Sequence, residues 1–591
     1  MPLFIEELTK AVLERADQAD RVAAVLSVSP LPALAVPSTL HASLTARLDR
    51  IGAAAKEVAQ IGAVLGREFY YELVKAVAQR NELELQASLA RLTDAGLLFC
   101  RGSPPHASYL FKHALVQDVA YGTLLRARRQ ELHARVAAVL ERHFADLVER
   151  QPELLAHHLT GAAETDRAVA QWLKAGQFAA TRFAHREAIR HFDRGIGLTG
   201  TMPEGPARAR REIDLQLARG LSLFTTEAFQ SPAAAQAYAR ARELSERHGN
   251  SQQLFMAVYG QWQGKVGSGR TTAARSLSER LLRLTEGGAD SGLRLQAHHS
   301  AWTTNWFAGQ PAEGREHCEE GRQLYDPEKH RTHSFLFGGH DPGTCAPNVA
   351  GVIYWSLGYP DTGLARSSEA LALAERIAHP LSLELVFLLR AMLHLDRREP
   401  EPALRLIDAA ETLVAEQRLG FMIEPRFFRG AALIGQGADE EAVVCLREGL
   451  STGPGKGQCR IYGLAVLAEA LTRRGEQEAA LAAVTEGMQI QQEMGQQAWE
   501  PELHRVRGIA LLGRNEREEG EKSLLEALAA AQRRRMKSYE LRAAMNLARL
   551  WGEQGRRAEA HELLAPIYGW FTEGFDTADL KDAKALLDAL A

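Results

Sequence analysis

Apolar residues recur along most of the chain at the spacing of amphipathic helices. From about Ala168 onward, successive stretches place an apolar residue every third or fourth position and then end at glycine or another turn residue. Strand-like alternation is confined to a short region near residue 100. The pattern predicts a mainly α protein built from many short helices joined by tight turns.

Small residues recur in register with these helices. The segment WLKAGQFAATRFAHREAIRHFDRG (172–195) carries them at tetratricopeptide spacing, where small side chains let two antiparallel helices approach closely. Equivalent small residues follow every 38 to 40 residues, at Gly351, Ala391, Gly430, Ala468, Gly508 and Ala548. We therefore expect about nine or ten helical hairpins over 168–575, forming an α-solenoid, and a capping helix over 576–591.

A solenoid of this kind presents a concave face to its ligands. We expect that face to bind a protein partner or a small-molecule inducer. One segment interrupts the period: YDPEKHRTHSFLFGGHDPGTCAPN (325–348) has proline, glycine and histidine where a hairpin needs helix formers. We consider this segment a candidate binding loop.

Residues 38–125 follow a different pattern. Helical periodicity runs through STLHASLTARLDRI, AAAKEVAQIGAVLG, EFYYELVKAVA and ELELQASLARLTDAG, the last ending at Gly96. Two strand-like runs follow, LLFCRG and SYLFKH, joined by the turn SPPHA. Helices followed by one β-hairpin predict a winged helix, with connecting helices over 126–167.

The charge of this block argues against DNA binding, the usual function of a winged helix. The helix before the hairpin carries Glu82, Glu84 and Asp94 against a single Arg91, a surface that repels phosphate. A later stripe of Arg126, Arg129 and His133 is more typical of a solvated or domain-contacting face. A winged-helix transcriptional regulator is therefore an alternative, and DNA is not the expected partner.

Composition narrows the class of protein further. The 591 residues are 46% apolar and 24% charged, with a net charge of −4, and they contain neither a membrane-spanning apolar run nor a secretion signal. We expect a cytoplasmic protein without a membrane partner. Five scattered cysteines, none in a C-x-x-C pair, indicate reduced thiols.

Neither a metal site nor a catalytic site is predicted. Potential ligands crowd the irregular segment, at His330, His333, His340, Asp341 and Cys345. Their spacing does not favour a shared site, because two histidines three residues apart do not face one ion well from one helix. The adjacent pairs His157–His158 and His298–His299 point in different directions along a helix and are predicted to be packing or surface residues. No nucleophile elbow or H-E-x-x-H motif occurs.

Several segments resemble one family of bacterial signalling proteins. They are PLFIEELTKAVLE, LTARLDRIGAAAKEVAQIGAVLGREF, YLFKHALVQDVAYGTLL, LAHHL and LLAPIYGWFTEGFDTADLKDAKALLDAL. Together they resemble the C-terminal part of proteins that join a class III adenylate cyclase domain to a STAND-type ATPase module and a tetratricopeptide tail. The resemblance implies that Pro2 matches the nucleotide-contacting lid proline and His113 the diphosphate-sensing histidine. Ala114 stands where the family commonly has an aspartate.

The nucleotide-binding loop of that family is missing from the sequence. No G-x-x-x-x-G-K-[ST] motif occurs, and the nearest strings, at 263–272 and 453–458, lie among helical repeats without a preceding strand. ATP or ADP is therefore implied only through an upstream ATPase or cyclase domain, and no cofactor is expected for this chain alone. Residues 1–37 match a remnant of the ATPase lid, which suggests a truncated gene, a split gene or a misassigned start codon.

The function expected from the sequence is a non-catalytic regulatory or scaffold region of a signal-transduction ATPase or adenylate cyclase. Two alternatives to this function are the transcriptional regulator named above and part of an ATP-hydrolysing or cyclase enzyme. In the second alternative the catalytic domains lie outside the chain.

Overall fold

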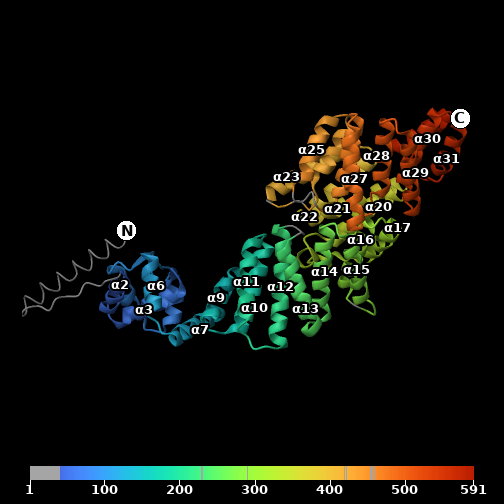
Figure 1. Ribbon diagram of the computed structural model, residues 1–591. Coiled ribbons are helices and arrows are strands. Elements are labelled where there is room, and N and C mark those ends of the chain that lie inside the picture. The colour runs from blue at the N-terminus through green and yellow to red at the C-terminus, as the bar shows by residue number, and fades with distance from the viewer. Residues whose placement is uncertain are drawn as a thin grey trace, which may run out of the picture. The chain divides into compact units, whose positions relative to one another are not determined.

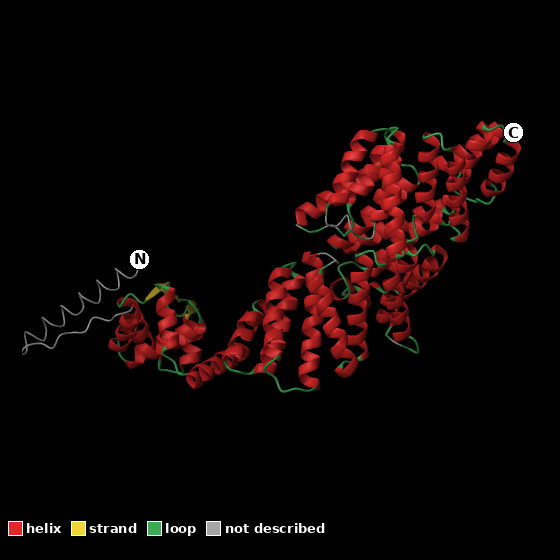
Figure 2. Ribbon diagram, viewed as in Figure 1, coloured by secondary structure: helices red, strands yellow, loops and turns green. Residues whose placement is uncertain are grey.

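A computed structural model describes residues 40–227, 231–288, 290–417, 419–420, 422–452, 457 and 459–591. The expected lid remnant, including Pro2, lies outside these residues. Helices dominate the described chain, and strands occur only in its first part (Figure 2). The chain divides into two compact units: residues up to Phe178 with Arg194–Pro203, and Ala179–Asp193 with Glu204–Ala591. None of the described helices is both long enough and apolar enough to cross a bilayer.

The first unit contains a small antiparallel sheet surrounded by helices. Its elements are α2 (Leu40–Arg50), α3 (Ala53–Leu65), β1 (Glu68–Tyr70), α4 (Tyr71–Ala78), α5 (Glu82–Asp94), β2 (Leu98–Arg101), β3 (Ser108–Phe111), α6 (Ala114–Gly122), α7 (Arg126–His143), α8 (Ala145–Arg150) and α9 (Pro152–Gly161). Helices α10 (Thr165–Thr181) and α11 (His185–Thr199) contribute to both units. The strand order is β1-β3-β2, with Phe69 and Cys100 both opposite Tyr109. This is the expected winged helix with one more strand than the sequence indicated.

Local chemistry explains these elements, and it corrects one expectation. Helix α5 begins where Asn81 Oδ1 accepts a hydrogen bond from Leu83 N, and Leu85, Leu89 and Leu92 on one face of it are buried. Gly96, just beyond its end, has φ +65°, as a C′ glycine should. The stretch Glu68–Tyr70 was expected to be helical and is strand β1, because its ladder to β3 buries Phe69 in the core beside Phe111. Pairing with a distant strand therefore overrides the local helical pattern.

The second unit is an α-solenoid. Its helices are α12 (Pro206–Glu227), α13 (Pro232–His248), α14 (Ser251–Gly267), α15 (Thr271–Leu284), α16 (Ser291–Phe307), α17 (Pro311–Leu324), α18 (Pro327–His330), α19 (His333–Leu336), α20 (Pro342–Ser356), α21 (Pro360–Ile377), α22 (Pro380–Asp396), α23 (Pro400–Gln417), α24 (Pro425–Gly435), α25 (Asp439–Ser451), α26 (Arg460–Arg473), α27 (Gln477–Met494), α28 (Glu500–Gly513), α29 (Arg517–Arg533), α30 (Lys537–Glu553), α31 (Arg557–Tyr568) and α32 (Ala578–Leu590). Consecutive helices pack in pairs, from α12 with α13 to α30 with α31 (Figure 1).

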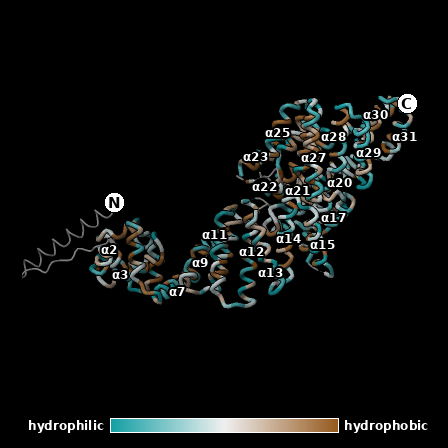
Figure 3. Tube along the Cα trace, viewed as in Figure 1, coloured by the Kyte–Doolittle hydropathy of each residue, from teal (hydrophilic) through white to brown (hydrophobic). Residues whose placement is uncertain are grey.

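The recurrent small residues lie where the sequence placed them. All six fall on the first helix of a hairpin, at Gly351 (α20), Ala391 (α22), Gly430 (α24), Ala468 (α26), Gly508 (α28) and Ala548 (α30). A Cβ on Gly430 would lie 2.4 Å from Leu446 Cγ on the second helix of its hairpin. Hydrophobic and hydrophilic residues alternate along these helices (Figure 3), so that each hairpin has an apolar face toward its neighbours. The tetratricopeptide-like solenoid is confirmed.

The second unit also contacts itself across long sequence distances. Gln497 N donates to Phe307 O at 2.7 Å, and Gln496 Nε2 donates to Gly269 O at 3.1 Å. Helix α20 contacts α30, where Ser538 Oγ donates to Trp355 O at 2.5 Å. These bonds join hairpins that are several repeats apart. The solenoid therefore curls tightly enough for its early and late repeats to meet. Helices from α14 to α28 share one hydrophobic core.

Candidate functional site: a chamber in the helical repeats

A small chamber lies inside the second unit, between the first helices of several hairpins. It encloses about 90 Å³. Its wall is mostly apolar and draws on residues far apart in sequence, including Trp262, Trp306, Val349, Leu385, Met392 and Trp499. Polar groups in this wall are few, and His299, His340 and Cys345 are three of them. A largely apolar cavity with a few convergent polar groups is the usual form of a ligand site.

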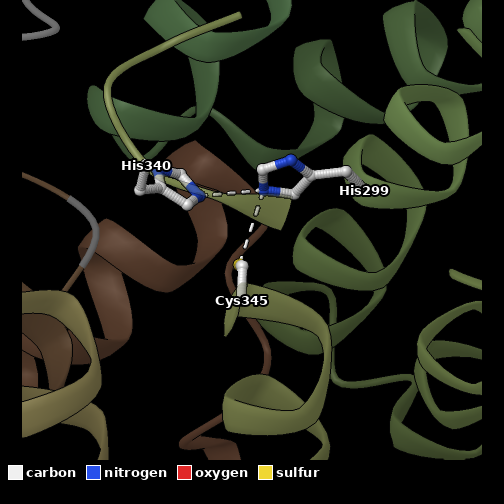
Figure 4. A group of neighbouring side chains, drawn as sticks. All are labelled: His299, His340 and Cys345. Atoms are coloured by element: carbon white, nitrogen blue, oxygen red, sulfur yellow. Dashed lines mark hydrogen bonds between the residues drawn. The ribbon is translucent and has the colours of Figure 1, made fainter. Parts of the chain in front are cut away.

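These three polar side chains point toward one another (Figure 4). His340 Nε2 lies 3.1 Å from His299 Nε2, and Cys345 Sγ lies 3.5 Å from the same nitrogen. His299 is supplied by α16 and Cys345 by the first turn of α20, while His340 immediately precedes α20. His299 and Cys345 are buried, with 4% and 3% of their surface exposed.

A chain of hydrogen bonds fixes the His299 ring. Its Nδ1 lies 3.1 Å from Gln296 Oε1 and 2.9 Å from the Tyr259 hydroxyl oxygen. Gln296 Nε2 in turn donates to His333 Nδ1 at 3.0 Å, which sets the orientation of the amide. His299 therefore carries its proton on Nδ1. Its Nε2 presents a lone pair to His340 and Cys345.

Burial keeps all three groups neutral in the chain by itself. It lowers the pKa of His299 well below the usual value, with the His340 ring adding to the effect. Burial likewise lowers the pKa of His340 to about 4. The pKa of the Cys345 thiol is raised by burial to about 12, which the neighbouring Trp302 indole partly opposes. The cluster is thus two imidazoles and a thiol rather than an ion pair.

A larger groove adjoins the chamber within the same unit. It measures about 1000 Å³ and shares Gly267, Met422, Ile423 and Cys459 with the chamber wall. Its apolar lining includes Phe183, Phe224, Leu381 and Phe427, and its charged lining includes Arg186, Arg190, Glu227 and Glu424. The chamber is therefore a recess beside an amphipathic groove of the size that accommodates ligands.

The irregular segment 325–348 reaches this site in an unexpected way. Its last seven residues are the start of α20, and α18 and α19 account for eight more. Phe337 is buried against Phe255 and Tyr259, and its carbonyl accepts a hydrogen bond from Gln263 Nε2 at 2.8 Å. Phe337 and Gly338 are therefore packed into the core and carry His340 inward.

The potential ligands of this segment are divided by the fold. His330 and His333 pack against each other with ring centroids 4.9 Å apart. Asp341 caps α20 by accepting hydrogen bonds from Gly343 N and Thr344 N. Only His340 and Cys345 of the five join the cluster described above. The third member is His299, which was predicted from the sequence to be a packing or surface residue. A signal for His299 was present, because Gln296 and Trp302 stand three residues to either side on one buried face of α16.

His113 lies at the junction that the sequence predicted. It is the N-cap residue of α6, directly after β3, and its side chain does not cap the helix. Its Nε2 is buried and makes no hydrogen bond within the described residues. The helix N-terminus beside it suits an anion.

Two other expectations for the first unit were tested by its packing. His133, predicted to lie on a solvated or domain-contacting stripe, is only 1% exposed. Its Nε2 lies 3.1 Å from the Tyr121 hydroxyl oxygen and its Nδ1 3.0 Å from His158 Nδ1. Of the two alternatives, His133 therefore has the contacting role, because α7 turns its side chain toward α6 and α9 and away from solvent. On α5, Glu82 pairs with Lys75 at 2.8 Å, which leaves this surface acidic or neutral.

No protein-family model matches the chain. A curated relative, an uncharacterized protein of Rhizobium meliloti (strain 1021), is 27% identical over 529 residues, which cover 88% of this chain and 50% of the relative. The chain therefore spans half the length of the curated relative that it matches.

Similar solved structures share little sequence with the chain. A Rap protein complexed with competence and sporulation factor is 14% identical, covering 64% of this chain and 99% of its own, with a TM-score of 0.44. A STAND protein with a tetratricopeptide repeat sensor, from Pyrococcus horikoshii, is 12% identical, covering 85% and 68%, with a TM-score of 0.28. Yeast Tom70 is 12% identical, covering 77% and 96%, with a TM-score of 0.28. At these values the similarities assign no ligand or activity to the chain.

Proposed function

We propose that this chain is the non-catalytic, ligand-binding region of a larger signalling protein, and that its helical repeats take up a peptide, either an inducer or a segment of a partner protein. The observation that carries the proposal is the groove of about 1000 Å³ in the second unit. A groove of this volume lies at the upper end of the range for small-molecule pockets, roughly 300–1000 Å³. It is therefore large enough for a short peptide.

The chemistry of the groove suits a peptide better than a purely apolar or purely ionic ligand. Leu381, Ile423 and Phe427 supply apolar surface for side chains. Arg190 and Glu424 supply groups of both charges for backbone amides and for the ends of a peptide. Mixed surfaces of this kind bind an extended chain through side-chain pockets and polar contacts together.

We further propose that the first unit couples ligand binding to an ATPase domain elsewhere in the full-length protein. The resemblance of FKHALVQDVAY to the sensing segment of STAND ATPases supports this role for His113, as does its unpaired Nε2 beside the N-terminus of α6. In this scheme ATP or ADP is held by a P-loop domain, and Pro2 and His113 complete the site.

Peptide selection tests the role of the groove. A random peptide library is selected on the immobilised chain, and the dissociation constants of the selected peptides are measured by fluorescence anisotropy. Leu381→Trp, which fills the groove, should weaken these peptides about fivefold to a hundredfold, since an overfilled contact costs roughly 1–3 kcal/mol. Leu525→Trp, on α29 and 42% exposed outside the groove, is the matched control.

The proposal fails if no peptide is selected, or if the selected peptides bind both variants like the original chain. Binding that is lost equally in both variants would place the peptide site elsewhere and would also contradict the proposal.

A further inference from the structure

We infer that His299, His340 and Cys345 form a binding site for a thiophilic transition-metal ion, Zn²⁺ or Cu⁺, in the chamber wall. Among the described residues, these three are the group of histidine, cysteine or acidic side chains whose ligand atoms converge, with all three atoms within 4.8 Å of one another. Two imidazoles and a thiolate are ligands that both ions prefer. The site is independent of the proposed peptide groove and goes beyond it.

The distances fit a metal centre. With Zn–N bonds of about 2.0–2.1 Å and Zn–S bonds of about 2.3 Å, tetrahedral geometry separates two nitrogens by roughly 3.3 Å, and nitrogen from sulfur by roughly 3.6 Å. The separations here are 3.1 Å between the two Nε2 atoms and 3.5 Å between Cys345 Sγ and His299 Nε2. The third pair, His340 and Cys345, has ligand atoms within 4.8 Å of each other, so coordination requires these two side chains to approach by up to about an ångström.

The proton arrangement also favours an ion. Because Gln296 holds the His299 proton on Nδ1, the single lone pair on His299 Nε2 is the only acceptor between His340 Nε2–H and the Cys345 thiol. Two donors therefore compete for one lone pair. His340 Nδ1, deprotonated in this tautomer, is buried and makes no hydrogen bond of good geometry within the described residues.

Coordination resolves this conflict with balanced protons. The Cys345 thiol loses its proton to solvent and binds as thiolate, while the His340 proton moves from Nε2 to Nδ1 so that Nε2 can bind. The Gly338 backbone favours the protonated form of His340. One proton is released for each ion bound. His299 needs no change, because Gln296 and Tyr259 already hold its outer nitrogen, as second-shell groups do in metal sites.

The surroundings separate this cluster from other histidine pairs in the chain. His298 Nδ1 and His317 Nδ1 also lie 3.0 Å apart, as do the Nδ1 atoms of His133 and His158, yet neither pair has a third ligand within the described residues. Three protein ligands leave a fourth position open toward the chamber of about 90 Å³. That volume holds a water or a small exogenous ligand. Met392 and Met422 also line the chamber and offer thioethers that would favour Cu⁺.

Cobalt titration of the full chain tests the inference. The reduced, chelator-treated protein is titrated with Co²⁺ and then with Zn²⁺. We expect one ion per chain, a thiolate-to-cobalt charge-transfer band, loss of that band when Zn²⁺ displaces Co²⁺, and a higher unfolding temperature with Zn²⁺. Competition with a Cu⁺ chelator under anaerobic conditions then shows which of the two ions binds more tightly.

Matched variants locate the site. Cys345→Ser should abolish the charge-transfer band and weaken Zn²⁺ at least about a hundredfold, because even second-shell losses cost about 10–100-fold. His340→Gln, at the less buried ligand, should weaken Zn²⁺ similarly while the chain stays folded. Cys445→Ser, at a half-buried thiol outside the chamber, and His298→Asn, beside His299, should bind like the original chain. Absence of the band, its persistence in Cys345→Ser, or its loss in either control would overturn the inference.

Discussion

The contact between α20 and α21 makes the solenoid geometry testable with one methyl group. Gly363 on α21 faces Gly351 on α20, and a Cβ at Gly363 would lie 2.5 Å from Gly351 O and 3.2 Å from Trp355 N. Both neighbours are main-chain atoms, so neither can rotate away as a side chain would. Gly363→Ala must therefore push the two helices apart.

The magnitude follows from two opposing effects. Overpacking a tight contact costs about 1–3 kcal/mol, whereas replacing glycine by alanine in a helix gains up to about 1 kcal/mol. Gly197→Ala, in α11, is the matched control, because a Cβ there meets nothing within 4 Å and only the gain applies. The difference between the two variants isolates the steric cost, about 1–3 kcal/mol.

Hydrogen exchange is the suitable assay, because a solenoid opens locally before it unfolds as a whole. Peptides from α20 and α21 should exchange about fivefold to a hundredfold faster in Gly363→Ala than expected from the control, by the same energy difference. Peptides from the first unit should be unchanged. Equal or slower exchange of α20 and α21 would show that the two helices do not approach as closely as described, and would refute the packing argument.

Two further predictions concern ionisable groups. Burial raises the pKa of Glu384 from 4.5 to about 8, so the folded chain binds this proton more tightly than the unfolded chain. The free energy of unfolding should therefore fall as the pH rises across that range, on the order of 1 kcal/mol per pH unit. Glu384→Gln should remove this pH dependence in urea unfolding, and an unchanged pH dependence would contradict the prediction. His113→Ala should leave the unfolding of this chain nearly unchanged. When an upstream ATPase region is present, it should raise the basal signalling output about tenfold to a hundredfold, since a charge-assisted bond contributes about 1.5–3 kcal/mol. Unfolding of residues 38–125 or an unaltered output would contradict the sensor role.

Features of the fold that depend on residues close together in the sequence could be predicted. The hairpin register follows from small residues at a fixed period, and the junction at His113 follows from a strand run that meets a helical run. Strand β1 was missed because three residues carry too little periodicity and their pairing partner, β3, lies about forty residues later. For His133 the sequence left a solvated and a domain-contacting face open, because a charged helix can still turn one polar residue inward.

The chamber could not be predicted because it depends on where the solenoid curls and where the irregular segment goes. Pro, Gly and His in 325–348 indicated a candidate binding loop, and the same glycines allow the chain to enter a crowded interior. Gly338 has φ +128°, and a Cβ there would lie 1.7 Å from Gln263 Nε2, the group that bonds the Phe337 carbonyl. Only glycine therefore lets the segment turn beside α14 and deliver His340 to His299. The break in the repeat is thus the feature that brings the polar cluster into an otherwise apolar wall, and its inward course ties the metal inference to backbone geometry as well as to side-chain chemistry.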